Sequence, residues 1–367
     1  MTAEVQLLRE GAAALAKRYG GAATLRARRA GRADDSDIFK ACVELGFQGV
    51  ALPESYGGVD MGWQGLAALM VEGGKALIDM PLLSGVQLAA EALLVCPEGA
   101  LRRELLEALT AGEQRIALAW QSEAAHPQLL QPSLHAKRDD QGWVLRGLAP
   151  MVTGLIGANG VLLSAQTEEG LALFYVATDE PGLSIEPQTL IDHRNCGLLR
   201  LDHLKLPEAQ LLASHEFCKT ALIRAHDAAR LGLAAQMLGG AQAAYETTLE
   251  YLKTRQQFDV PIGSFQALQH RIARVFILQQ LAEAALVQGL IGFNLGGKES
   301  ARAVALAKAK CGEAYLLAAK EGVQMHGGIG VTDEHEMGFH LKSAQVANQL
   351  CGSADACRSD WADNAGY

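Results

Sequence analysis

The sequence predicts an α+β protein built from three consecutive parts. An N-terminal helical domain is expected over residues 1–113, a middle antiparallel β domain over residues 114–212, and a C-terminal four-helix bundle over residues 213–367. Apolar residues recur at helical spacing in the first third, short alternating runs fill the middle, and long proline-free periodic segments fill the rest. A chain of 367 residues is also too long for one small core.

Helices dominate the first 112 residues. Residues 34–36, Asp-Asp-Ser, supply capping side chains before a helix that contains Ile38. The turn-rich residues 52–59 precede a helical stretch over about 63–77, and a further helix is expected over about 97–110.

Short strands are expected between Ile116 and Leu212, because turn residues interrupt the apolar runs about every ten residues. The runs that predict them are Gly142–Arg146, Val161–Ala165, Leu171–Val176 and Leu199–Leu206.

Four long helices are expected beyond Ser214, and the short links between them favour an antiparallel bundle. The first would reach roughly 55 Å at 1.5 Å per residue. Their expected ranges are 217–253, 265–293, 299–324 and 333–356.

Composition excludes several classes of protein. The formal charge of −9 argues against nucleic-acid binding, which depends on clustered Lys and Arg. The seven cysteines form no CxxC pair, and no His or Cys cluster accompanies Cys351 and Cys357 at zinc-ligand spacing. The charged N-terminus lacks a signal sequence, and we find no apolar run of about 20 residues. We therefore expect a cytoplasmic protein with free thiols, no metal and no membrane insertion.

The most informative segment is residues 251–270, Tyr-Leu-Lys-Thr-Arg-Gln-Gln-Phe-Asp-Val-Pro-Ile-Gly-Ser-Phe-Gln-Ala-Leu-Gln-His. Its Arg255 stands at a helix end, where a guanidinium suits bidentate binding of a pyrophosphate. Spacing alone equally allows Arg255 to cap the helix and Phe258 to be core. The apolar residues that suit an adenine ring are Phe258, Ile262, Phe265 and Leu268.

A second segment, Gln324–Gly330, follows a long helix and reads Gln-Met-His-Gly-Gly-Ile-Gly. Its glycines allow a backbone to approach a cofactor closely. A helix C-cap with a left-handed glycine explains the same pattern, so the segment alone is a weak signal.

Together the two segments resemble the acyl-CoA dehydrogenase family, whose Arg-x-Gln-Phe-Gly and Gln-x-x-Gly-Gly motifs clasp FAD. The α, β-barrel, α-bundle order of that family covers essentially the whole chain, and Pro53–Gly58 is similar to its N-terminal turn motif. The wording of residues 251–270 is closest to small subunits of heteromeric enzymes, such as the pimeloyl-CoA dehydrogenase small subunit.

The resemblance implies that part of the chain reaches across a dimer interface to FAD held by the neighbouring subunit. Asp259, which stands where the family has Gly, adds negative charge near the expected pyrophosphate. We also assign Ser353, of a Gly-Ser in place of the family's Gly-Thr, to the cofactor. The residues expected to reach across are Arg255, Gln257, Phe258, Ile262, Phe265, Gln324, Gly327 and Gly328.

The family's catalytic glutamate is missing from both positions where its members carry it. One position lies 23 residues after Gly328 and holds Cys351, and the other lies 26 residues before Arg255 and holds Ala229. Asp227 is a weak substitute, because about 200° of helix rotation points it to a different face. A Cys351 thiolate is a further alternative as the base. Burial argues against it, because burial raises the pKa of a thiol and so disfavours the thiolate.

The half-site for the chain's own flavin ring is also altered. Residues 119–127 replace the family's Thr-Glu-Pro segment, and residues 147–153 replace its Gly-x-Lys-x-Trp-Ile-Thr segment. Only Thr153 keeps a hydrogen-bonding side chain for the isoalloxazine.

Three functions are compatible with these residues. The chain is the subunit without the glutamate in an α2β2 acyl-CoA dehydrogenase, a self-sufficient homodimeric or homotetrameric dehydrogenase with an unusual base, or a non-catalytic relative that binds acyl-CoA or acts as a scaffold. The first hypothesis implies FAD, an acyl-CoA substrate, a homologous glutamate-bearing subunit and electron-transfer flavoprotein as acceptor. The identity of the acyl group cannot be read from the sequence.

Overall fold

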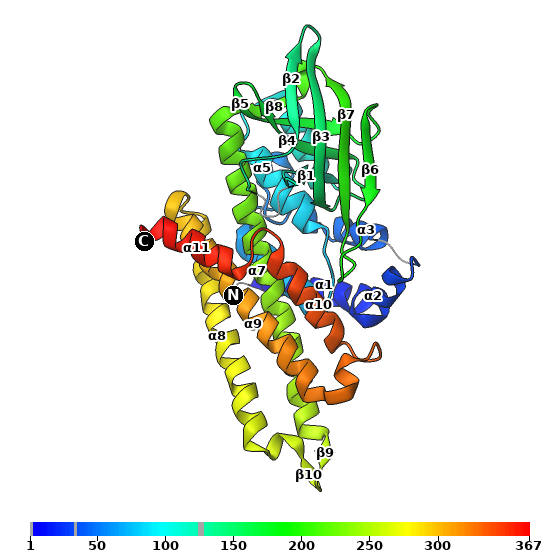
Figure 1. Ribbon diagram of the computed structural model, residues 1–367, viewed down its shortest axis with the longest axis vertical. Coiled ribbons are helices and arrows are strands. Elements are labelled where there is room, and N and C mark those ends of the chain that lie inside the picture. Colours follow the sequence, from blue (N-terminus) through cyan, green and yellow to red (C-terminus); the bar gives the residue numbers. More distant parts are fainter. Residues whose placement is uncertain (1–2, 33–34, 124–127) are drawn as a thin grey trace.

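The computed structural model describes residues 3–32, 35–123 and 128–367. Figure 1 shows an elongated molecule with the sheet at one end and the bundle extending away from it. The expected order of helical domain, sheet domain and helical bundle is confirmed. Asp34, one of the predicted capping residues, lies outside the described residues.

The N-terminal domain is helical, as predicted. Asp35 does not cap the following helix with its side chain; instead its carboxylate accepts hydrogen bonds from Arg115 (2.7 Å) and Asn195 (2.8 Å). It therefore ties this domain to the sheet domain. The elements are α1 (Ala3–Tyr19), α2 (Gly21–Arg29), α3 (Ser36–Glu44), η1 (Phe47–Gly49), η2 (Glu54–Tyr56), α4 (Gly62–Lys75), the π-helical η3 (Leu83–Ala90), α5 (Glu91–Val95) and α6 (Ala100–Thr110).

The middle domain is one eight-stranded sheet in the order β6-β7-β3-β2-β4-β5-β8, with β1 paired to β4. The predicted antiparallel pairing holds for five of the seven strand pairs of this sheet and fails at β4, which pairs in parallel with both β1 and β2. Alternation reports which face a side chain occupies and carries no information on strand direction. The strands are β1 (Ile116–Ala119), β2 (His135–Asp139), β3 (Gly142–Thr153), β4 (Gly160–Thr167), β5 (Gly170–Ala177), β6 (Leu183–Pro187), β7 (Cys196–Leu206) and β8 (Leu211–Ser214).

Three long helices and two shorter ones form the bundle, joined to the sheet through η4 (Glu208–Gln210) and β8. The first three expected helices are confirmed to within about two residues at each end. The elements are α7 (His215–Thr254), β9 (Gln256–Gln257), β10 (Val260–Pro261), η5 (Ile262–Ser264), α8 (Gln266–Phe293), α9 (Gly297–His326), η6 (Gly327–Val331), α10 (Met337–Gln349) and α11 (Ala354–Ala365).

The prediction of a single fourth helix over residues 333–356 is wrong, because a turn separates α10 from α11. Leu350 is extended, Cys351 has a φ of 56° and Gly352 a φ of 100°. Ser353 then caps α11, its hydroxyl accepting from the Ala356 amide at 3.2 Å. Apolar spacing continues through this turn, so periodicity alone conceals it.

The arrangement in space separates two ends of the bundle. Figure 1 shows the sheet against the first part of α7, whereas the α7–α8 and α9–α10 turns lie at the opposite end. One large core joins the N-terminal helices to the bundle, and a second fills the sheet. A small third core, made of Leu252, Ile262 and Met325, lies beneath the two distant turns. We call the sheet side the near end and the turn side the far end.

Helix α8 is the one helix of the described chain long and apolar enough to cross a membrane by length and composition. A bundle helix passes the same test, and α8 packs against α9 and α7 along its length. Its other face exposes apolar side chains, including Phe276, Ile277, Leu281, Val287 and Ile291.

Candidate cofactor site at the far end of the bundle

The first far-end segment is a tight hairpin. Gln257 pairs with Val260, so Phe258 and Asp259 form a two-residue loop with φ values of 54° and 62°. Two left-handed residues are typical of a type I′ turn, which favours Asn and Gly and strains a bulky residue. The Phe258 side chain is nevertheless 86% exposed. The chain therefore holds an aromatic ring in solvent on a strained backbone, which is typical of functional sites.

Arg255 closes α7 with its backbone and leaves its side chain exposed. Its amide donates to the Tyr251 carbonyl, and its carbonyl accepts from the Ile262 amide, both at 2.8 Å. Within the part of the chain that the structure describes, its guanidinium has no ion-pair partner. The backbone of Arg255 alone therefore makes the contacts that end the helix. Its side chain is not used for capping and remains available to an anion.

The expected adenine-packing residues separate into two groups. Phe265 is 38% exposed and lies edge-on to Phe258, with ring centroids 6.1 Å apart. Ile262 is buried in the third core instead, and Leu268 packs against that core. Only the two aromatic rings are therefore placed to contact a ligand from outside the chain.

The second far-end segment presents glycines that the chain's own packing does not require. A Cβ atom at Gly328 would meet nothing within 4 Å, and its φ is not in the left-handed region. Gly327 is also open, although its φ of 64° favours glycine. At Gly330, in contrast, a Cβ would lie 2.6 Å from the Val323 carbonyl oxygen. The packing of the chain therefore does not explain a glycine at position 328, whereas a closely approaching cofactor would explain it.

The structure brings the two segments to the same end of the molecule. Both turns lie over the third core, where Leu252 and Ile262 from the first segment meet Met325 from the second. Figure 1 shows the α7–α8 turn at the tip farthest from the sheet and the α9–α10 turn between that tip and α2. Arg255, Gln257, Phe258, Gln324, Gly327 and Gly328 are all exposed there. An unpaired guanidinium, exposed rings and open glycines fit a pyrophosphate with an attached adenine, so these residues suit FAD.

At the near end, neither expected base position provides a base. Ala229 is fully buried in the large core. Cys351 lies in the left-handed turn before α11, and burial raises the pKa of its thiol to about 11. Burial also raises the pKa of Asp227 to about 6, against the opposing influence of Arg230 and Arg224.

The near-end turn is held by two buried cations that the sequence did not reveal. The Lys308 ammonium donates to the carbonyls of Ala347 (3.0 Å), Asn348 (3.1 Å) and Gly352 (3.2 Å), and burial lowers its pKa to about 8. Arg230 donates through Nε to the Cys351 carbonyl at 2.7 Å. Its Nη2 atom also lies 2.6 Å from an Asp360 carboxylate oxygen. No spacing rule marks Lys308, which stands in an alanine-rich helix.

The described residues expected near the chain's own flavin ring are largely buried where the sheet meets α7. Thr153 ends β3 and is only 6% exposed. Beside it, Gln121 donates to the Met151 carbonyl at 3.0 Å. Trp120 is buried edge-on against His226 of α7, with ring centroids 5.4 Å apart. Residues 124–127 of the altered segment lie outside the described residues.

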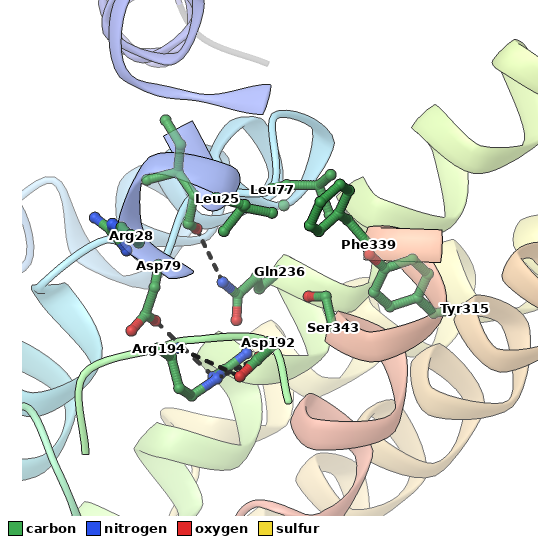
Figure 2. Close-up of a pocket in the computed structure, with 12 residues that line it drawn as sticks. Leu25, Arg28, Leu77, Asp79, Asp192, Arg194, Gln236, Tyr315, Phe339 and Ser343 are labelled. Atoms are coloured by element: carbon green, nitrogen blue, oxygen red, sulfur yellow. Dashed lines mark hydrogen bonds and ion pairs between the residues drawn. The ribbon is translucent and has the colours of Figure 1, made fainter. Parts of the chain in front are cut away.

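A buried ionic cluster joins all three domains (Figure 2). Arg194, in the β6–β7 loop, lies 2.8 Å from the Asp192 carboxylate and 3.9 Å from that of Asp79. Gln236 of α7 donates to the Ile78 carbonyl at 3.1 Å. Burial raises the pKa of Asp79 in spite of Arg194. The cluster faces no predicted cofactor residue, and we assign it to domain packing.

The fold and the far-end residues together define the class of flavin-dependent acyl-CoA dehydrogenases. The family model described as acyl-CoA dehydrogenase, N-terminal domain, matches residues 2–113, and the C-terminal domain model of the same family matches residues 220–365. The chain belongs to the acyl-CoA dehydrogenase family.

Relatives match along nearly the whole chain. Acyl-CoA dehydrogenase IpdE2 of Mycobacterium tuberculosis is 31% identical over 95% of this chain and 93% of its own length. Acyl-CoA dehydrogenase FadE12 of the same species is 29% identical over 94% and 91%. Among solved structures, a variant of the Tcur3481-Tcur3483 steroid ACAD has 30% identity and a TM-score of 0.88, covering 99% of this chain and 97% of that chain.

A second solved structure similar to this chain is the ChsE4-ChsE5 complex from Mycobacterium tuberculosis. It has 25% identity and a TM-score of 0.89, and the match covers 100% of this chain and 98% of that chain. Both of these structures are named as assemblies of two different proteins.

Proposed function

We propose that this chain is the subunit without the catalytic base in a heteromeric acyl-CoA dehydrogenase. The observation that carries the proposal is that Ala229 and Cys351 occupy the two base positions, while Arg255, Phe258 and Gly328 remain exposed. In an α2β2 assembly, a homologous subunit would supply the glutamate that removes the proton α to the thioester.

A bound FAD would supply an acceptor for the hydride that leaves the β carbon of the acyl-CoA. This chain's residues bind and orient the cofactor from across the interface. The Arg255 guanidinium neutralises the pyrophosphate with bidentate geometry. The bare backbone at Gly327 and Gly328 allows close approach, and the exposed Phe258 and Phe265 rings cover the adenine.

The near end argues against an independent active site. A thiol with a pKa of about 11 is ionised in roughly one molecule in ten thousand at pH 7. Asp227 is buried on another face of α7 from Ala229, next to Arg230. Trp120 closes on α7 at the place where the family's ring-contacting segment lies. Among the described residues, a carboxylate at either base position and the family's ring-contacting residues other than Thr153 are thus missing together.

The relatives favour a heteromer and a bulky substrate. One similar structure is titled a steroid ACAD and the other a complex of two different proteins. We extend both features to this chain as part of the proposal: a homologous partner subunit and an acyl-CoA with a large acyl group. We further propose electron-transfer flavoprotein as the electron acceptor and the cytoplasm as the location.

Co-expression tests the proposal against its two alternatives. The chain purified alone should be colourless and should not oxidise acyl-CoA with an artificial electron acceptor. Co-expression with a glutamate-bearing homologue, such as one encoded by a neighbouring gene, should yield a yellow, active complex. Yellow, active protein from this chain alone would establish the self-sufficient enzyme. A complex that stays colourless and inactive would favour the non-catalytic relative.

A further inference from the structure

Three aromatic rings form a stack at the far end that connects the two cofactor segments. The rings of Tyr251 and His326 have centroids 4.3 Å apart with an interplanar angle of 31°. The His335 ring also contacts His326, with an interplanar angle of 46° and ring centroids 4.3 Å apart. Tyr251 stands one helical turn before Arg255, and His326 immediately precedes Gly327. The contact thus joins the last turn of α7 to the last residue of α9.

His326 is held in a fixed orientation. It is only 3% exposed, and its Nδ1 atom lies 2.7 Å from the Gly322 carbonyl oxygen. Because a carbonyl can only accept, Nδ1 carries the proton. The Nε2 atom is buried without a hydrogen-bond partner among the described residues. Burial lowers the pKa of His326, so the ring in the stack is neutral at pH 7.

Separate contacts hold the chain that follows the glycines. The two terminal nitrogens of Arg29, Nη1 and Nη2, contact the Asp333 carboxylate at 2.7 and 2.5 Å. Arg26 donates to the Asp333 carbonyl. Thr247 of α7 donates to the Glu336 carboxylate at 3.1 Å. These contacts therefore fix the residues that follow the glycine turn, and the contact between the Tyr251 and His326 rings fixes its start.

We propose that Tyr251 and His326 are positioning residues that set the spacing between Arg255 and the Gly327–Gly328 turn. Neither ring touches the cofactor; each acts through the neighbouring segment. The inference rests on the proposed function, because the spacing matters only if both segments bind one FAD. Aromatic contacts favour particular distances between rings, and misplacing a binding group by about 1 Å has a large effect on a bound reactant.

Hydrogen exchange of the chain alone tests the coupling without any flavin. Tyr251→Ala should speed amide exchange in residues 327–332 as well as in residues 255–262, because both segments lose their common support. Tyr251→Phe keeps the ring and removes only the long hydrogen bond from the Tyr251 hydroxyl to the His326 carbonyl (3.5 Å), so it should stay close to the wild type. Tyr245→Ala is the control, since that ring contacts Phe276 of α8 at 5.9 Å instead. Faster exchange confined to residues 255–262 would overturn the inference.

FAD affinity in the flavin-bearing complex is the functional readout. Tyr251→Ala should weaken FAD binding about tenfold, and Tyr251→Phe should restore it to within about twofold of the wild type. Arg255→Ala serves as the reference. If Arg255→Ala releases the flavin while Tyr251→Ala does not, the inference is wrong and the proposed function stands. If Arg255→Ala retains the flavin, the proposed function fails, and the exchange experiment still decides whether the rings couple the segments.

Discussion

The two ends of the bundle differ in whether their polar and apolar side chains find partners within the described chain. At the near end, Lys308 and Arg230 bind the carbonyls of the turn around Cys351, and Ser353 caps the next helix. At the far end, Arg255 has no ion-pair partner among the described residues, and Phe258 stands in solvent. The near end is closed on itself, whereas the far end is built for contacts that the chain cannot make alone.

The difference is energetic as well as geometric. A left-handed Phe258 costs about 1–2 kcal/mol, and exposing its ring forgoes the gain of burial. Cys351 at the near end is also left-handed, but its carbonyl accepts a hydrogen bond from Arg230, so the chain itself holds that turn. In the chain's family, both ends would serve one catalytic cycle. Under the proposed function, the far end of this chain would still bind the cofactor, and the near end would serve packing alone.

The largest effect is expected at Arg255. Arg255→Ala should weaken FAD binding in the complex by about a hundredfold, because a charge-assisted bidentate contact contributes about 2–3 kcal/mol. Thermal stability of the chain alone should be unchanged, as the exposed guanidinium has no ion-pair partner within the described chain. Flavin absorbance after gel filtration measures the first quantity, and thermal unfolding measures the second.

Lys253→Ala supplies the matched control for Arg255. Lys253 is an exposed cation two residues earlier on the same helix and lies outside the motif. If both variants lose flavin equally, then general positive charge rather than the Arg255 fork explains binding. The proposed role of the far end in binding the cofactor through Arg255 would then be wrong.

Asp227 tests whether the near end is a site for packing or for chemistry. Its folded-state pKa of about 6 is above the ordinary value of 3.8, so its contribution to stability is fully present below pH 4 and is lost as the pH rises through 6. Asp227→Asn removes this loss. The variant should be more stable than the wild type at pH 8, by about 1–3 kcal/mol, and by a smaller margin at pH 5.

Urea unfolding at the two pH values measures this margin, and the exposed Asp140→Asn serves as the control. Acyl-CoA oxidation by the complex should be unaffected by Asp227→Asn. A loss of activity without a loss of flavin would identify Asp227 as the base and refute the division between the two ends.

The exposed residues of the far end could be predicted from the sequence, whereas the contacts of the near end could not, for a physical reason. A cofactor contact needs particular residues at fixed local spacing, and Arg255, Gln257 and the Gln324–Gly328 pattern carry that information in short segments. Lys308 acts on carbonyls about 40 residues away, and no local pattern reports such a contact. The break at Cys351 was hidden for a related reason, because apolar spacing persists through the turn that Lys308 and Arg230 stabilise from outside.

The smallest effect, at Gly328, isolates the far end's dependence on a partner. Gly328→Ala adds a Cβ atom into open space at an ordinary φ, so it should leave the chain alone as stable or stabilise it by about 0.4–1 kcal/mol. In the complex it should weaken FAD binding about tenfold, because the added methyl group intrudes on the cofactor.

Gly330→Ala should show the reverse pattern, since its Cβ would lie 2.6 Å from the Val323 carbonyl oxygen and 3.0 Å from the His326 Cβ. It should lower the melting temperature of the chain alone. The two glycines are two residues apart, and only one is explained by the fold that contains it. If Gly328→Ala binds FAD as the wild type does, the open space at Gly328 is solvent, and the cofactor must approach the far end from the side of Arg255 alone.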